Sequence, residues 1–239
     1  MLHVSLLGQF ELRSDGERIQ IPSRAGQSLF AFLILNAHTA FRREYLAGQI
    51  WGNLSEEQAR HHLRQELWRV RKAICSTEGE CHYLRISEIE IGFNPTSAYW
   101  LDTEEFKRIP AHAPTLTELL TGAALYRGEL LPGFYEDWVL QERETLNALY
   151  EARMCNLLDL LIAKQEWTAV LEWAEQWISL GGTPEPAFRA LMHAYAALGD
   201  HAKIAQTYAR CQHALRENLD IDPAAETTAL YEKLLNAPL

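Results

Sequence analysis

The sequence predicts an α+β domain at residues 1–101 followed by an all-α domain of helical repeats at residues 102–239. Three observations predict this division. Strand-like alternation of apolar and polar residues is confined to the first part, whereas every long segment of the second part has helical periodicity. The charge divides in the same way, because the first part holds 11 basic and 11 acidic residues and the second part holds 11 and 21. The acidic second part is therefore not expected to bind phosphate.

The composition is that of a globular protein, with 48% apolar and 23% charged residues among 239. No stretch approaches 18 uncharged apolar residues, and the first residues lack the basic start and plain apolar run of a secretory signal. We therefore expect a cytoplasmic protein without a membrane segment. The four cysteines contain no CxxC pair, so we expect reduced thiols at Cys75, Cys81, Cys155 and Cys211.

The first domain opens with strands and continues with helices. Alternation around the turn sequence at residues 14–16 predicts a β-hairpin within residues 2–21. A helix of about four turns is expected to follow Ser23 and to end near Asn36. Residues 42–51 predict a second helix, whose end is marked by the glycine that follows.

A third helix is expected to run from Ser55 to Cys75. Ser55 and Gln58 have the spacing of a capping box, which marks the start of a helix. Its apolar residues fall on a single stripe and are Ala59, Leu63, Leu67, Val70 and Ile74. The opposite side of this helix is therefore expected to face solvent or a partner.

A second hairpin and seven helices complete the predicted elements. Residues 82–86 and 89–93 alternate around the connection Ser87-Glu88, and residues 99–101 predict one more short strand. The helical segments that follow lie at about 103–107, 115–127, 136–164, 167–180, 185–198, 201–217 and 223–235. A shift of 34 residues superposes Leu157 on Leu191, which is the period of tetratricopeptide helix pairs. The second domain is therefore predicted to be tetratricopeptide-like.

The outer side of the third helix is the strongest candidate for a binding surface. Residues 60–72 contain five basic residues and a single acid, Glu66. The side chains that can donate to base edges in a major groove about 12 Å wide are Arg64, Gln65 and Arg69. The remaining candidates are Arg60, Arg71 and Lys72 for phosphates, His61 for either role, and Trp68 for a sugar or a thymine methyl group.

Two interpretations of this basic surface compete. An amphipathic helix commonly has a solvated basic side without any partner. Here, however, three helices with a basic last helix are followed at once by a β-hairpin, which is the order of a winged helix-turn-helix. This context favours DNA binding, with His82, Tyr83 and Arg85 of the wing reaching the backbone of the adjacent minor groove. Glu88 and Glu90 would weaken the contribution of this wing, because they repel phosphate.

Enzyme and metal functions lack support in the sequence. The motifs for phosphate loops, dinucleotide binding, zinc hydrolysis and a serine nucleophile elbow are absent, so we expect neither an enzyme nor a cofactor. His62 and Glu66 have i, i+4 spacing, but two ligands are too few for a metal site. A structural role for His62 is therefore favoured, and no metal is expected.

The chain resembles a regulator of the Streptomyces antibiotic regulatory protein (SARP) type, in which an OmpR-like winged helix precedes a bacterial transcriptional activation domain. The resemblance covers nearly the whole chain and rests on the order of several stretches, among them LHVSLLGQFEL, ARHHLRQELWRVRKAI, YWLDTEEF, ALYRGELLPGFYEDWVLQERETLNALYE and HAYAALGDHAKIAQTYARCQHALRENLDIDPAAET. It implies a transcriptional activator that binds direct repeats of double-stranded DNA as a side-by-side pair and contacts RNA polymerase. Relatives often continue into an ATPase module, so the chain is expected to be either a short regulator or part of a longer one.

The resemblance also implies roles for particular residues. Carried over by position, the residues of the third helix that enter the major groove are His61, Arg64, Gln65, Trp68 and Arg69. In such families the connection between the second and third helices contacts polymerase, and here it consists of Gly52, Asn53 and Leu54. The alternative function is a protein-interaction adaptor, in which the repeat domain binds a partner and the winged helix has lost DNA binding. The acidic second part and the acidic wing motivate that alternative.

Overall fold

The computed structural model describes residues 1–75 and 81–236, and its contacts divide the chain into two compact units. The N-terminal unit consists of Met1–Pro110 and Leu125–Asn147, and the C-terminal unit consists of Ala111–Ala124 and Ala148–Leu239. These units are defined by contacts, whereas the predicted boundary after residue 101 divides the chain by sequence. That boundary stays a prediction.

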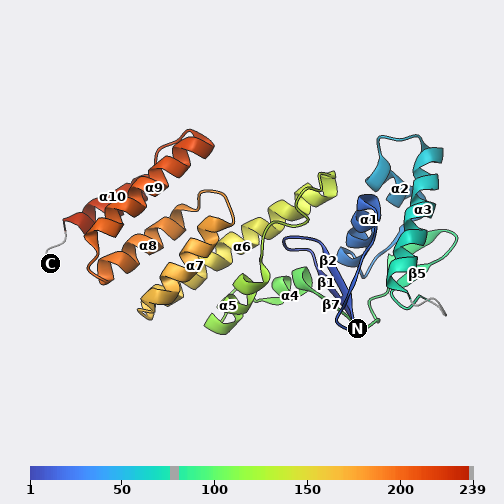
Figure 1. The fold of residues 1–239 in the computed structure, drawn as a ribbon, viewed down its shortest axis with the longest axis horizontal. Helices are drawn as coiled ribbons and strands as arrows, with labels where there is room; N and C mark the ends of the chain where they lie inside the picture. The colour runs from blue at the N-terminus through green and yellow to red at the C-terminus, as the bar shows by residue number, and fades with distance from the viewer. Residues whose placement is uncertain (76–80, 237–239) are drawn as a thin grey trace. The chain divides into compact units, whose positions relative to one another are not determined.

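The N-terminal unit contains two β-sheets and four short or medium helices (Figure 1). Its strands are β1 (Leu2–Ser5), β2 (Glu11–Ser14), β3 (Glu17–Ile19), β4 (Ala40–Arg42), β5 (Leu84–Ile86), β6 (Glu90–Phe93) and β7 (Tyr99–Leu101). Its complete helices are α1 (Arg24–Leu35), α2 (Arg43–Trp51), α3 (Glu56–Ile74) and α4 (Asp102–Arg108). The strand orders are β3-β2-β1-β7 and β4-β6-β5. The predicted α+β architecture of this part is confirmed.

The first sheet joins the start of the chain to residues almost a hundred positions later. Strands β2 and β3 form the predicted hairpin, and its turn residues Asp15 and Gly16 have positive φ angles of 49° and 89°. Such angles are those of a tight hairpin turn. The predicted strand at residues 99–101 is present as β7, and it pairs in parallel with β1 through Val4 opposite Leu101. No local pattern of residues indicates this pairing.

Helices α1, α2 and α3 pack together in the N-terminal unit. The Ser55 hydroxyl accepts a hydrogen bond from the Gln58 N–H at 3.4 Å, and the Gln58 side chain accepts one from the Ser55 N–H at 3.3 Å. This is the predicted capping box. The residues of α3 that are buried are the five members of the predicted apolar stripe and, in addition, Glu66. Strand β4, between α1 and α2, was not predicted.

The second hairpin is held against the start of α2. Its turn residues are Glu88 and Ile89, one position later than predicted, because the Ser87 N–H donates to the Glu90 carbonyl at 2.9 Å. The Arg43 guanidinium donates to the Ser87 carbonyl at 2.8 Å, and the Arg43 N–H donates to the Ile89 carbonyl at 3.0 Å. The wing is therefore short and fixed at its turn.

A buried carboxylate joins β1 to α4. Asp102 is 1% exposed and accepts hydrogen bonds from the N–H groups of Leu6 at 2.8 Å, Leu7 at 2.9 Å and Thr103 at 2.8 Å. Burial raises the pKa of this carboxyl to about 6, although the three N–H donors act in the opposite direction. Asp102 thus fixes the end of β1 at the start of the helix that follows β7.

Residues after helix α5 (Leu116–Leu125) complete the N-terminal unit. Leu7 forms an isolated antiparallel bridge with Leu130, and the Leu131 N–H donates to the Leu6 carbonyl at 3.0 Å. Arg143 of helix α6 (Asp137–Ala163) donates to the carbonyls of Leu130 at 2.9 Å and Leu131 at 2.8 Å. This segment therefore adds to the edge of the winged-helix part through backbone and arginine hydrogen bonds.

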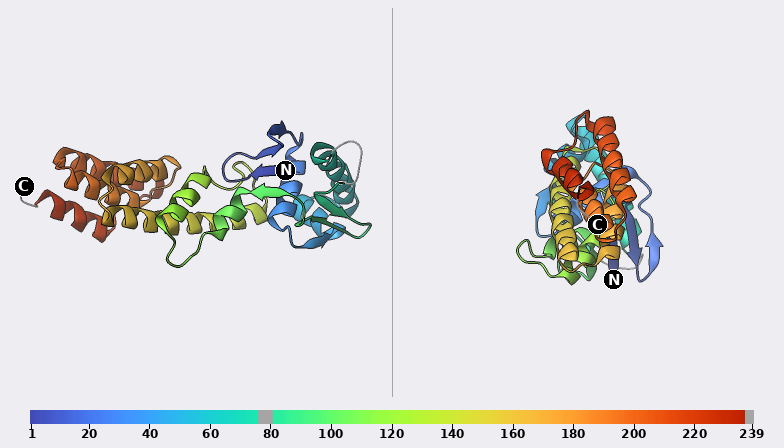
Figure 2. Two further views of the ribbon diagram at one scale, coloured as in Figure 1. Left: turned by 90° about the horizontal axis from the view of Figure 1, so that it is seen from below. Right: turned by 90° about the vertical axis from the view of Figure 1, so that its left-hand side faces the viewer.

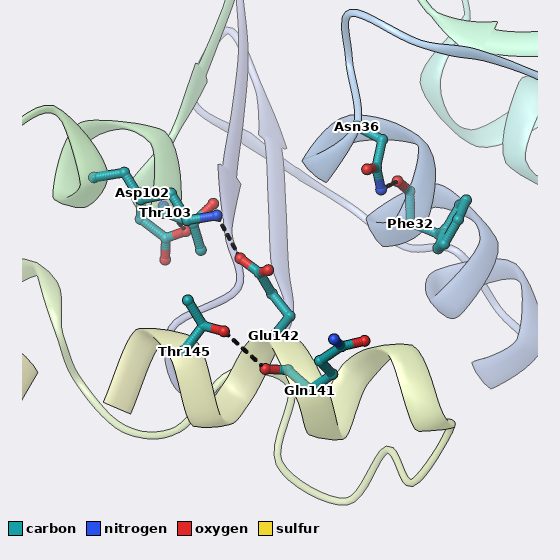
Figure 3. Close-up of polar contacts among 8 residues, drawn as sticks. Phe32, Asn36, Asp102, Thr103, Gln141, Glu142 and Thr145 are labelled. Carbon is teal, nitrogen blue, oxygen red and sulfur yellow. Dashed lines mark hydrogen bonds and ion pairs between the residues drawn. The ribbon is translucent and has the colours of Figure 1, made fainter. Parts of the chain in front are cut away.

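Side chains also bond to the backbone within helices. In Figure 3 the Asn36 amide donates to the Phe32 carbonyl at 2.8 Å, and the Thr145 hydroxyl donates to the Gln141 carbonyl at 3.0 Å. The Phe32 carbonyl also accepts the Asn36 N–H at 3.3 Å, so the backbone and the side chain of Asn36 both close the last turn of α1. Between helices, an ion pair joins Lys107 of α4 to Glu142 of α6.

The remaining helices confirm the predicted repeat domain. They are α5 (Leu116–Leu125), α6 (Asp137–Ala163), α7 (Trp167–Ser179), α8 (Glu185–Ala197), α9 (His201–Leu219) and α10 (Ala225–Leu235), with ends within two residues of those predicted. In the C-terminal unit α7 packs on α8, α8 on α9, and α10 on both α8 and α9 (Figures 1 and 2). Gly199 has a φ angle of 75° in the turn between α8 and α9, and Phe188, Cys211 and Leu215 form a core between them. None of the helices within the described ranges has the length and apolarity needed to cross a bilayer.

The expectation of four reduced thiols is wrong for one pair. Cys75 and Cys81 form a disulfide with their Cα atoms 5.1 Å apart, whereas Cys155 and Cys211 are free as expected. Cys75 caps the end of α3 and Cys81 precedes β5. The fold places the two cysteines close enough to bond, and their spacing of six residues in the sequence does not reveal this.

Candidate nucleic-acid interface

Helix α3 presents the predicted base-reading residues on one exposed side. A shallow hollow on its surface is lined by His61, Arg64, Gln65, Trp68 and Arg69. Trp68 is 61% exposed, an unusual position for so large an apolar side chain. The structure therefore brings all five residues together on a helix surface that is open to a partner.

Two of the predicted phosphate ligands lie at the end of α3. Arg71 and Lys72 are exposed and belong to the last turn of the helix. The Lys72 ammonium lies 5.1 Å from the centre of the Trp68 ring, at cation–π distance. These two cations extend the positive surface from the hollow to the carboxyl end of the helix.

The third predicted phosphate ligand is partly neutralised. The Arg60 guanidinium forms an ion pair with Glu56 and lies 3.8 Å from the Glu44 carboxylate of α2. Glu57 also lines the depression beside Arg60, between the starts of α2 and α3. The positive charge of α3 is therefore concentrated in its middle and at its end.

Arg69 has a second role that the sequence did not indicate. Its guanidinium forms an ion pair with the carboxylate of Glu66, which is only 4% exposed and also accepts the Ser23 hydroxyl. By composition alone, Glu66 is one acid beside the five basic residues of positions 60–72. Its spacing from Leu63 and Val70, at i−3 and i+4, places it on the buried stripe and could have revealed its burial.

The predicted wing residues lie at the base of the hairpin. Tyr83 is half-buried, and its carbonyl accepts the Asn94 N–H at 2.9 Å. Arg85 is exposed, with its Nε donating to the Phe93 carbonyl at 3.2 Å. The turn instead presents Glu88 and Ile89, and Ile89 is 64% exposed. DNA contacts by Tyr83 and Arg85 stay a prediction.

The predicted polymerase contact and the predicted structural histidine lie close in sequence. Gly52 and Asn53 are exposed and Leu54 is half-buried, with its N–H donating to the Trp51 carbonyl at 3.0 Å. His62 is half-buried and stacks on Trp51, with ring centres 6.1 Å apart. Among residues 1–75 and 81–236, no group of three or more histidine, cysteine or acidic side chains could hold a metal.

Comparisons with known proteins bear on both parts of the chain. A family model described as "Bacterial transcriptional activator domain" matches residues 103–235, which is more than half of the chain. The whole chain is similar in fold to Mycobacterium tuberculosis EmbR in complex with a low-affinity phosphopeptide, with a TM-score of 0.75 and 20% identity. The match covers 100% of this chain and 66% of the EmbR chain. No curated protein sequence matches significantly.

Proposed function

The chain belongs to the bacterial transcriptional activator domain family, and from that premise we propose that it regulates transcription by binding specific sequences of double-stranded DNA. The family membership, together with the fold, confirms the resemblance to SARP-type regulators. In the proposed complex α3 lies in the major groove. The observation that carries this proposal is the exposed surface of His61, Arg64, Gln65, Trp68 and Arg69 on a helix followed by a hairpin.

The proposed roles of the individual residues follow from their positions along α3. Arg64 and Gln65 are exposed in the middle of the helix, and their guanidinium and amide groups suit base edges. Arg71 and Lys72 lie at its end, where a groove-bound helix meets the sugar–phosphate backbone. We further propose that two copies bind direct repeats side by side, in the cytoplasm, and that residues 52–54 contact RNA polymerase.

A binding titration tests the proposal. Fragments selected from a genomic pool supply the specific site, and fluorescence anisotropy at 50 and 200 mM salt gives the affinity. The affinity should fall steeply with salt, because each neutralised phosphate releases counterions. An affinity that is equal at both salt concentrations, or no selected sequence at all, would exclude DNA as the ligand of α3.

One observation favours the adaptor as the second candidate. The C-terminal unit contains a cavity of about 420 Å³ among α6, α8 and α10, lined by Cys155, Leu158, Asp159, Ile162, Pro186, Arg189, Ala190, His193, Glu226 and Leu230. A cavity of this size could take a segment of another protein. Retention of a protein partner by the full chain, without retention of any DNA fragment, would favour this function over the first.

A further inference from the structure

We propose that Cys75 and Cys81 form a redox-sensitive site, at which a reversible disulfide raises the DNA affinity of α3. This inference rests on the proposed function, because it concerns the same helix. The two cysteines are both half-buried, so small thiol and disulfide reagents can reach them. Their disulfide connects the end of the proposed recognition helix to the start of the wing.

The first end of this connection is the last turn of α3. Cys75 is the C-cap of the helix, and its N–H donates to the Arg71 carbonyl at 2.9 Å. The next residue inward, Ile74, is 5% exposed and packs in the core. Arg71 and Lys72, the proposed phosphate ligands, belong to this same turn. A covalent bond that holds Cys75 in place therefore also holds the backbone that carries Arg71 and Lys72.

The second end is anchored to the sheet. The residues that follow Cys81 are held by Asn94, whose side chain donates to the His82 carbonyl at 2.8 Å and whose N–H donates to the Tyr83 carbonyl at 2.9 Å. Asn94 follows directly after β6. The disulfide therefore ties the end of α3 to a backbone position that the second sheet already holds.

Reduction removes this tie, and the last turn of α3 is then held by its helical hydrogen bonds and by the packing of Ile74. A helix end with fewer tertiary contacts frays more, because its last carbonyls lack helical partners. Arg71 and Lys72 are then less firmly positioned, and ordering them on DNA costs conformational entropy. We expect reduction to weaken DNA binding by about threefold to tenfold, the effect of one or two phosphate contacts.

The chemistry balances with a disulfide as the oxidant. A thiolate of one cysteine attacks glutathione disulfide and releases one glutathione, and the second cysteine then displaces the other glutathione. Two electrons and two protons pass from the protein dithiol to the two glutathiones, while one S–S bond forms and one breaks. A regulator bound to DNA works where thiols are kept reduced, and disulfides in that environment are usually transient and regulatory.

The test compares oxidised and reduced forms of the full chain. Glutathione buffers set the redox state, alkylation with iodoacetamide and mass spectrometry report the Cys75 and Cys81 thiols, and anisotropy reports DNA affinity. Reduction should weaken binding by the stated factor in the wild type and in the control Cys155→Ser. The double variant Cys75→Ser/Cys81→Ser should bind like the reduced protein in both buffers.

Two results would overturn the inference on its own. The two thiols could stay alkylatable in glutathione disulfide, or the wild-type affinity could be equal in both buffers. Because both comparisons use the wild-type chain, they hold even where a serine variant folds poorly. Absence of DNA binding in either redox state would instead overturn the proposed function, and this inference with it, whereas the alkylation result would still report whether the pair oxidises.

Discussion

Ser23 and Glu66 link the start of helix α1 to the middle of helix α3. The Ser23 hydroxyl accepts a hydrogen bond from the Gly26 N–H at 3.1 Å, which caps α1, and donates its own proton to the Glu66 carboxylate. Glu66 in turn pairs with Arg69 on the proposed DNA surface. The orientation of α3 in the N-terminal unit therefore depends on a polar contact at the base of α1.

The close approach of α1 and α3 predicts a strong effect at Gly26. A Cβ atom there would lie 2.8 Å from the Ser23 hydroxyl and 2.9 Å from a Glu66 carboxylate oxygen, so Gly26→Ala should destabilise the protein by about 1–3 kcal/mol. At Gly48, in α2, a Cβ meets no atom within 4 Å. Gly48→Ala should therefore stabilise the protein by about 0.5–1 kcal/mol. Urea unfolding measures both, and the same sign for the two variants would contradict the contact.

Base reading by Arg64 and Gln65 predicts a loss that depends on the DNA sequence. Arg64→Ala and Gln65→Ala should each cost about 1–3 kcal/mol on the selected site and less on random DNA. Arg18→Ala serves as the matched control, because it removes an exposed cation from the first sheet, on β3. Anisotropy titrations on both DNAs measure the difference. Equal losses on the two DNAs would make Arg64 and Gln65 backbone ligands instead.

The ion pairs of α3 predict that its cations contribute unequally to the salt dependence. Arg71→Ala should lower the slope of log affinity against log salt by about 1, the value for one lost phosphate contact. Arg60→Ala should lower the slope less, because Glu56 already neutralises that guanidinium. Titrations at four salt concentrations give the slopes. A larger effect of Arg60 would mean that its pair with Glu56 opens on DNA.

Asp102 predicts a stability change at mildly acidic pH. Burial raises the pKa of this carboxyl from 3.8 to about 6, so the folded state holds the proton more tightly than the unfolded state. The stability that this proton provides is complete below about pH 4 and is lost as the pH rises through about 6. In Asp102→Asn, which cannot titrate, this decline should be absent. Urea unfolding of both proteins from pH 4 to 7 provides the test, and parallel curves would refute the assignment.

Local patterns were sufficient to predict most of the elements. The capping box at Ser55 and Gln58 and the apolar stripe of α3 depend on residues within a few turns, as do the amphipathic helices of the repeat domain. The features that were missed depend on the path of the chain. The pairing of β1 with β7, the Asp102 contacts with Leu6 and Leu7, and the disulfide all join segments that only the folded structure brings together.

The candidate site was likewise predicted only in part. Its exposed members follow from the helical wheel, because burial of the stripe forces the opposite residues outward. The pairing of Arg69 with Glu66 and of Arg60 with Glu56 and Glu44 required side-chain geometry. All three partners are acids, and a count of charges along the sequence does not indicate which cations they neutralise.

The backbone pairing between the residues just after β1 and residues near position 130 has a consequence for synthesis of the protein. Leu6 and Leu7 emerge early from the ribosome, yet Leu130 and Leu131, whose backbones pair with theirs, are translated much later. Strand β1 can pair with β2 at once, whereas the backbone groups of Leu6 and Leu7 must wait for their partners. A fragment ending at residue 101 would leave these groups without those partners permanently, and truncations that keep residues up to 147 are the better choice for isolating the winged helix.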